Sequence, residues 1–145
     1  MCFGVKINWG AWLVAGVLGG IVYAVVANVL MIVSGTAPLY AETAQLWKPM
    51  IDSSWFTGMI ALNFIAALLL AFAFAILHKA LPYSGAKAGA VLGFTVWLAM
   101  GLPGMLVVYW TMAIPTAILI EWIVNGLLQT VLGGAVIGAV YKIKK

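Results

Sequence analysis

The stretch TAILIEWIVNGLLQTVLGGAVIGAVY, residues 116–141, decides the fold. It holds one charged residue, Glu121, and is long enough for a helix to cross the ~30 Å of hydrocarbon in a bilayer. It is too long and too continuously apolar for a strand of a membrane barrel. A helix also satisfies its backbone hydrogen bonds within a single segment, as lipid requires. The stretch therefore predicts a transmembrane helix.

Three further segments share this apolar character, at residues 12–33, 55–77 and 88–109. Each is close to the roughly 20 residues that a spanning helix needs. Turn-forming residues separate the segments, and Pro115 stands where the first turn of a helix tolerates proline. We therefore predict an all-α integral membrane protein, a four-transmembrane-helix bundle that forms one domain over residues 1–145, with an outer loop at residues 34–54.

The composition supports a membrane environment. The chain has 145 residues, of which 66% are hydrophobic and 7% charged, whereas a soluble domain has about 25% charged residues. In water such a chain would expose large apolar patches, so the lipid bilayer is the expected partner. The net charge of +4 is too small and too scattered for a nucleic-acid surface. A cleaved signal peptide is a rival interpretation of the first segment, whose apolar run exceeds the roughly 7–15 residues typical of such peptides.

The lysines predict the orientation. With four spans, one side of the membrane receives both termini and the 78–87 loop, and this side carries Lys6, Lys79, Lys87, Lys142, Lys144 and Lys145. The other side carries only Lys48, together with Glu42 and Asp52. Because positive loops stay inside, we expect both termini to be cytoplasmic, in the plasma membrane of a prokaryote.

Small residues recur at every fourth position along the predicted spans and predict tight helix packing. In lipid, helices associate through close backbone approach rather than by hiding apolar surface from water. The pattern does not separate contacts within one chain from contacts with a second copy or another membrane protein. The glycines of these stripes are Gly16, Gly20, Gly89, Gly93, Gly126, Gly134 and Gly138.

Polar residues inside the predicted spans form one cluster. Glu121, Asn125 and Gln129 follow one another at four-residue spacing, so they share a helix face. At 1.5 Å per residue, Glu121 and Asn28 lie about 8 Å below the outer ends of their spans, and Asn63 and Asn125 about 12–14 Å. Side chains from three helices are therefore expected to meet in the outer half of the bundle.

The third span contains Gly101, Pro103 and Gly104 at a similar depth. Proline lacks a backbone donor and clashes with the preceding turn, so we predict a helix break at this point. The carbonyl groups freed near Ala99 and Met100 would need partners or water.

Two interpretations of the polar cluster are open. It could be a small outward-facing cavity that binds a small solute, an ion or a proton, with Glu121 as the charge-bearing group. It could instead be a set of interhelical hydrogen bonds, worth on average ~0.6 kcal/mol each, that set helix register. A non-catalytic accessory subunit of a larger membrane complex is the alternative function. The outer loop could form a short surface helix near residues 41–48, either as a linker or as a lid over the cavity.

Catalytic and cofactor sites are not expected. His78 is the only histidine and Cys2 the only cysteine, so the chain lacks a zinc cluster, a paired haem ligand set and a redox cysteine pair. The sequence also contains no hydrolase or phosphate-binding motif. We therefore expect a protein without metal or cofactor that is not an enzyme.

Overall fold

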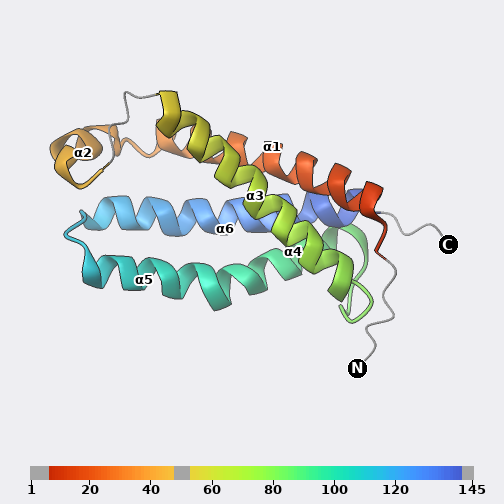
Figure 1. Cartoon of the computed structure of the whole chain (residues 1–145). Coiled ribbons are helices and arrows are strands. Elements are labelled where there is room, and N and C mark those ends of the chain that lie inside the picture. The colour runs from red at the N-terminus through yellow and green to blue at the C-terminus, as the bar shows by residue number, and fades with distance from the viewer. Residues whose placement is uncertain (1–6, 48–52, 142–145) are drawn as a thin grey trace.

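The computed structural model describes residues 7–47 and 53–141, and within these residues every regular element is helical (Figure 1). Four helices are long and apolar enough to cross a membrane, which confirms that prediction. They are α1 (Trp9–Val33), α3 (Ser53–Leu77), a third helix built from α4 (Gly85–Val96), the π-helical turn η2 (Trp97–Gly101) and α5 (Leu102–Thr111), and α6 (Thr116–Val140).

The first helix begins earlier than the predicted residue 12 because Asn8 caps it. The Asn8 side-chain oxygen accepts a hydrogen bond from the backbone N–H of Ala11 at 3.1 Å, which satisfies one of the free donors at a helix start. The backbone N–H of Asn8 donates to the Tyr141 hydroxyl at 3.3 Å. This bond joins the start of α1 to the end of α6, so the chain enters and leaves the bundle at one end.

The residues behind the orientation prediction lie mostly outside the described part of the chain. Lys79 and Lys87 lie at the end of the bundle where α3 ends and α4 begins. Glu42 lies on α2. The remaining residues of the prediction lie outside the described residues, as does Cys2: they are Lys6, Lys48, Asp52, Lys142, Lys144 and Lys145. The sidedness of the termini stays a prediction.

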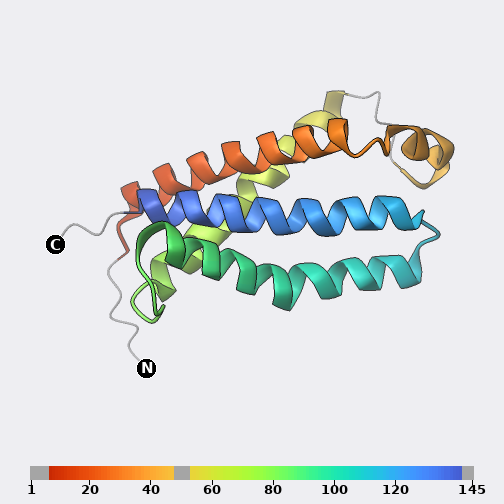
Figure 2. The same ribbon diagram turned by 180° about the vertical axis from the view of Figure 1, so that it is seen from behind.

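Helix α6 is the centre of the bundle. It lies between α1 and the α4–α5 helix, and α3 crosses it obliquely (Figures 1 and 2). The buried core gathers toward the end of the bundle at which α6 finishes, around Ala71, Phe74, Leu92 and Ile137. No residue of α5 is buried. The bundle is therefore tightly packed at one end and looser at the end next to the first interhelical segment.

The glycine stripes pack helices of the same chain against one another. A Cβ atom added to Gly89 would overlap the backbone carbonyl oxygen of Gly134, and one added to Gly93 would overlap that of Thr130. On α1, Gly16 and Gly20 face Leu68 and Phe64 of α3, and on α6 Gly126 faces the Trp97 ring and Gly138 faces Gly85. The sequence did not show whether the glycine stripes contact the same chain or another one. In the structure they contact helices of the same chain.

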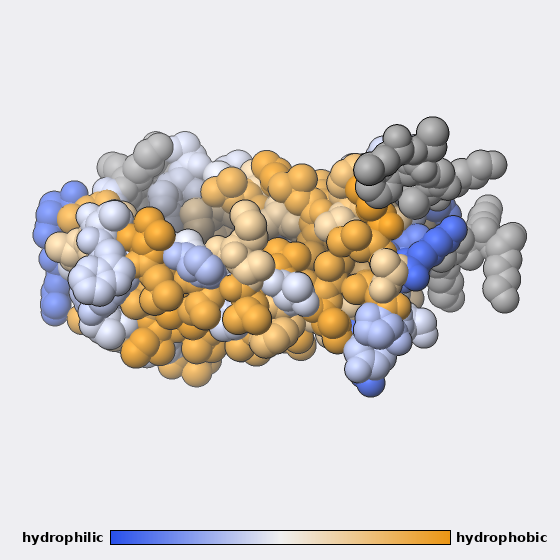
Figure 3. All heavy atoms as spheres, turned by 90° about the horizontal axis from the view of Figure 1, so that it is seen from below, coloured by the Kyte–Doolittle hydropathy of each residue, from blue (hydrophilic) through white to orange (hydrophobic). Residues whose placement is uncertain are grey.

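The outer surface of the bundle is apolar. Figure 3 shows hydrophobic side chains over the middle of the molecule and hydrophilic ones at its two ends. Large side chains such as Ile32, Leu69 and Val107 are 80%, 63% and 62% exposed. Hydrocarbon tolerates such a surface and water does not. These features indicate a multi-pass membrane protein.

The loop between α1 and α3 contains a short helix, but this helix begins earlier in the sequence than predicted. We predicted a short helix near residues 41–48, but the structure has α2 at Ala37–Glu42 and a 3₁₀ turn, η1, at Ala44–Leu46. Pro38 lies in the first turn of α2, where its fixed φ favours a helix start.

Candidate functional site

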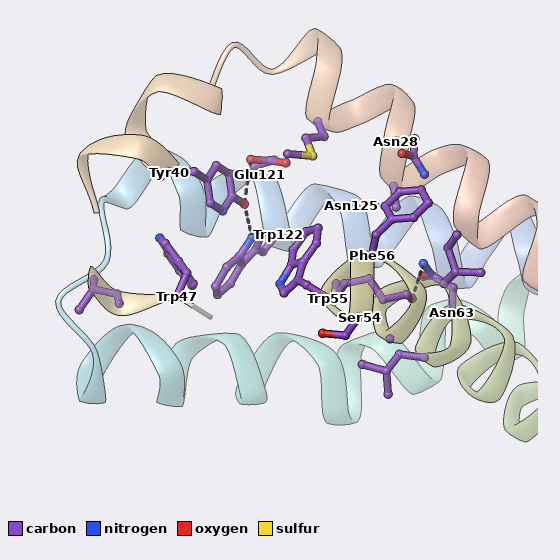
Figure 4. Close-up of a pocket in the computed structure, with 17 residues that line it drawn as sticks. Asn28, Tyr40, Trp47, Ser54, Trp55, Phe56, Asn63, Glu121, Trp122 and Asn125 are labelled. Carbon is purple, nitrogen blue, oxygen red and sulfur yellow. Dashed lines mark hydrogen bonds between the residues drawn. The ribbon is translucent and has the colours of Figure 1, made fainter. Parts of the chain in front are cut away.

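A cavity of about 850 Å³ opens at the end of the bundle next to α2 (Figure 4). Its walls come from α1, α3 and α6, and the segment containing α2 and η1 contributes Tyr40, Leu46 and Trp47. The oblique course of α3 explains the space. Glycines hold α3 against α1, but α3 diverges from α6 toward the α2 end (Figures 1 and 2).

Glu121 is the acidic group of this cavity. It lies in the second turn of α6 and is only 8% exposed. Its Oε2 atom accepts hydrogen bonds from the hydroxyl groups of Thr36 and Tyr40, the latter at 3.4 Å. Thr36 is itself 5% exposed. The carboxyl group therefore ties the segment between α1 and α3 to α6.

Thr36 was not among the predicted site residues. Thr36 lies between Gly35 and Pro38 and looks like an ordinary turn residue. Its sequence separation of 85 residues from Glu121 leaves no local signal. Only the fold brings its hydroxyl group to the carboxylate.

Aromatic rings surround the approach to Glu121. The ring centroids of Tyr40 and Trp47 are 5.5 Å apart, and those of Trp47 and Trp122 are 5.6 Å apart. The Trp122 indole N–H donates to the Tyr40 hydroxyl at 2.6 Å. Trp55 and Phe56 of α3 also line the cavity. This cluster was not predicted from the sequence, although the density of aromatic residues between positions 40 and 56 was an available signal.

Burial fixes the protonation of Tyr40. Desolvation raises the pKa of this phenol from its ordinary value of 10.0 to about 12, because burial penalises the charged phenolate. The proximity of Glu121 acts in the same direction, and the bond from Trp122 opposes it. At neutral pH the Tyr40 hydroxyl is therefore a hydrogen-bond donor to Glu121.

The structure brings Asn28, Asn63, Glu121 and Asn125 together in the cavity wall. The amide groups of Asn28 and Asn63 donate to backbone carbonyls of their own helices, at 2.7 Å to Ala24 and 3.1 Å to Met59. The Oδ1 atom of Asn125 is buried and has no hydrogen-bond partner among the described residues.

Gln129 does not line the cavity. Its amide donates to the Tyr23 carbonyl at 3.0 Å and to Asn63 Oδ1 at 3.2 Å. It therefore links α6 to both α1 and α3, at a point deeper in the bundle than the cavity. This is the contact expected of an interhelical hydrogen bond that sets register.

Gly101, Pro103 and Gly104 lie on the third helix, away from the cavity wall. The turn before Pro103 is π-helical, and the N–H of Leu102 bonds to the carbonyl of Trp97, five residues back. The Trp97 indole N–H donates across to the Ile123 carbonyl of α6 at 3.2 Å. At the predicted break the third helix thus has a π-helical turn and continues to Thr111.

No group of three or more His, Cys, Asp or Glu residues able to hold a metal ion occurs within residues 7–47 and 53–141. His78 lies near the opposite end, with its ring centroid 5.7 Å from that of Tyr141. Searches of family models, curated proteins and solved structures found nothing that matches this chain. The interpretation of the site therefore depends on its own chemistry.

Proposed function

We propose that this chain binds a small solute in the cavity beside α2 and carries it, or a proton coupled to it, across the membrane. One observation carries the proposal: Asn28, Asn63, Glu121 and Asn125, from three different helices, line a single cavity of about 850 Å³. This volume falls in the range of roughly 300–1,000 Å³ typical of small-molecule sites. Glu121 would be the charge-bearing group.

The hydrogen bonds of the cluster support a binding site over simple interhelical packing. If the polar residues served only to join helices, they would bond to one another. Among the five predicted residues, only the bond from Gln129 to Asn63 does so. A buried polar atom without a partner costs about 1–3 kcal/mol, and the Asn125 Oδ1 atom has none among the described residues. No interhelical bond between described residues therefore accounts for this atom.

The segment containing α2 and η1 would act as a lid. It covers one side of the cavity and is held by the bonds of Thr36 and Tyr40 to Glu121. A ligand that engages Glu121 would compete with these hydroxyl groups. Ligand binding would in this way loosen the lid, so that occupancy of the cavity favours its opening.

We further propose that both termini are cytoplasmic and that the chain resides in the plasma membrane of a prokaryote. The lysine distribution supports this orientation. In this orientation, the lid and the cavity would face the outer side.

An accessory subunit of a larger membrane complex is the second candidate. The glycine stripes, on which this hypothesis first depended, contact helices within the chain. The α5 helix now supports it, because none of its residues is buried and Trp110 is 85% exposed. Native mass spectrometry of gently solubilised membranes would reveal a stoichiometric partner if this candidate is right.

Flux into liposomes tests the transport proposal. Glu121→Gln should abolish proton-linked uptake or efflux while the helix content stays unchanged. Lys79→Gln is a control, since it also removes one charge and Lys79 is exposed at the end of the bundle opposite the cavity. Equal flux in wild type and a folded Glu121→Gln variant would remove Glu121 from the site.

A further inference from the structure

We propose that the ligand is an organic cation with an apolar or aromatic body. The inference deepens the proposed function and rests on it, because it assigns a substrate class to the same cavity. Three features lead to it: the uncompensated acid, the aromatic rings and the size of the cavity.

The described part of the cavity wall contains an acidic group and no basic one. Glu121 is the only ionisable carboxyl group in the wall, and no lysine lines it among the described residues. Lys79 and Lys87 lie at the opposite end of the bundle. Both hydrogen bonds to the carboxyl group reach Oε2, and neither brings a positive charge. An ionised carboxylate in a buried position is costly without a countercharge, so a cationic ligand is the partner that this site favours.

The aromatic side chains of the cavity also favour a cationic ligand. The faces of tryptophan and tyrosine rings attract cations within about 6 Å of the ring centre. Tyr40 bonds to Glu121, and Trp55 and Trp122 line the same cavity (Figure 4). Trp47 packs against both Tyr40 and Trp122. A ligand near Glu121 would therefore meet both a carboxylate and the electron-rich faces of aromatic rings.

The remaining wall disfavours an anion or a bare metal ion. The amide groups of Asn28 and Asn63 already donate to their own helices, and the Tyr40 hydroxyl donates to Glu121. An anion would meet only the remaining N–H groups of such side chains, and no positively charged group among the described residues. A volume of about 850 Å³ walled also by Met31 and Met59 requires a bulky apolar body, whereas a metal ion needs several close ligands.

Equilibrium dialysis against nanodiscs that contain the purified chain tests the assignment, with empty nanodiscs to subtract partition into lipid. The probes are tetraphenylphosphonium, tetraphenylborate, which has the same shape and the opposite charge, and the neutral triphenylphosphine oxide. We expect saturable binding of the phosphonium and at least tenfold weaker binding of the other two. Glu121→Gln should weaken phosphonium binding about tenfold or more. Lys79→Gln, which also removes one charge but at the opposite end of the bundle, should leave it unchanged.

Substitutions at Trp55 separate aromatic attraction from packing. Trp55→Phe retains a ring face and should retain most of the phosphonium affinity, whereas Trp55→Leu should lose several-fold. Equal affinity in these two variants would contradict a role for the ring. Circular dichroism of each variant checks that it is folded.

The outcomes distinguish this inference from the proposed function. If the neutral or anionic probe binds as tightly as the phosphonium, and Gly58→Phe in the cavity wall blocks that binding, the cation assignment is wrong and the cavity is still a binding site. If no probe binds saturably, both the cation assignment and the binding role of the cavity are overturned.

Discussion

At the scale of single residues, Glu121 connects the parts of the candidate site. Its carboxyl group accepts hydrogen bonds from the hydroxyl groups of Thr36 and Tyr40. Trp122, the next residue along α6, donates a hydrogen bond to the Tyr40 hydroxyl. Such a network is worth most when every member is satisfied, because the low dielectric of a buried site strengthens each bond. The lid is therefore held by these bonds and by the contact of Trp47 with the Trp122 ring, since no residue of α2 is buried.

Thr36→Val should loosen the lid. Valine has the shape of threonine without its hydroxyl group, so Glu121 would lose a buried donor, at a cost of about 1–3 kcal/mol. Hydrogen exchange of residues 36–47 should become faster. Thr95→Val is the control, because Thr95 is exposed and its hydroxyl bonds to the Val91 carbonyl of its own helix. Unchanged exchange in the Thr36 variant would show that this bond does not hold the lid.

Tyr40 should titrate at an unusually high pH. Its pKa is raised from 10.0 to about 12, so the folded state holds the proton more tightly than the unfolded chain does. The contribution of Tyr40 to stability is therefore complete below pH 10 and is lost as the pH rises toward 12. The difference in tyrosinate absorbance between wild type and Tyr40→Phe would give the midpoint. A midpoint near 10.0 would show that the phenol is exposed to solvent.

At the scale of elements, the contact between α4 and α6 is the closest in the molecule. Glycines on both helices let one backbone lie directly against the other. The contact between α1 and α3 differs, because glycines of α1 receive the side chains of Leu68 and Phe64. Helices α1 and α4 pack against α6, and the oblique course of α3 leaves the cavity among α1, α3 and α6.

Gly89→Ala should destabilise the bundle by about 1–3 kcal/mol, as overpacking does. The new methyl group would overlap the Gly134 carbonyl oxygen, and backbone cannot move aside as a flexible side chain can. Gly104→Ala is a matched control on α5, because no atom lies within 4 Å of the added Cβ. Denaturant unfolding in mixed micelles would measure both. Equal stability of the two variants would contradict the close approach of α4 and α6.

At the scale of the whole molecule, both ends of the described chain lie at one end of the bundle. Asn8 bonds to the Tyr141 hydroxyl there, and the lid lies at the other end (Figure 1). Four spans require this arrangement. Which end faces the cytoplasm depends on the lysines, most of which lie outside the described residues.

Tags at the two termini should both be protected in intact cells. The positive-inside rule places the lysine-rich side in the cytoplasm. A membrane-impermeant reagent should label a cysteine introduced at residue 45 and should not reach either tag until the cells are opened. Labelling of the two tags from opposite sides would contradict an even number of spans, and labelling of both in intact cells would reverse the orientation.

The sequence by itself determined the class of fold and much of the candidate site. Long apolar runs require helices in lipid because each must satisfy its own backbone, so four such helices were predictable. The four-residue spacing and depth of Glu121 and Asn125 also placed them near Asn28 and Asn63, and all four line one cavity. Helix periodicity and rise are local properties, and they carried this part of the prediction.

Only the tertiary structure decided which groups complete the site. Thr36 and Tyr40 reach Glu121 across 85 and 81 residues of sequence, and Gln129 turns away to join α1 and α3. It also assigned the glycine stripes to contacts within the chain and left Pro103 outside the cavity wall. The physical reason is that crossing angles between helices and the path of a loop depend on side chains distant in sequence, which no local pattern encodes.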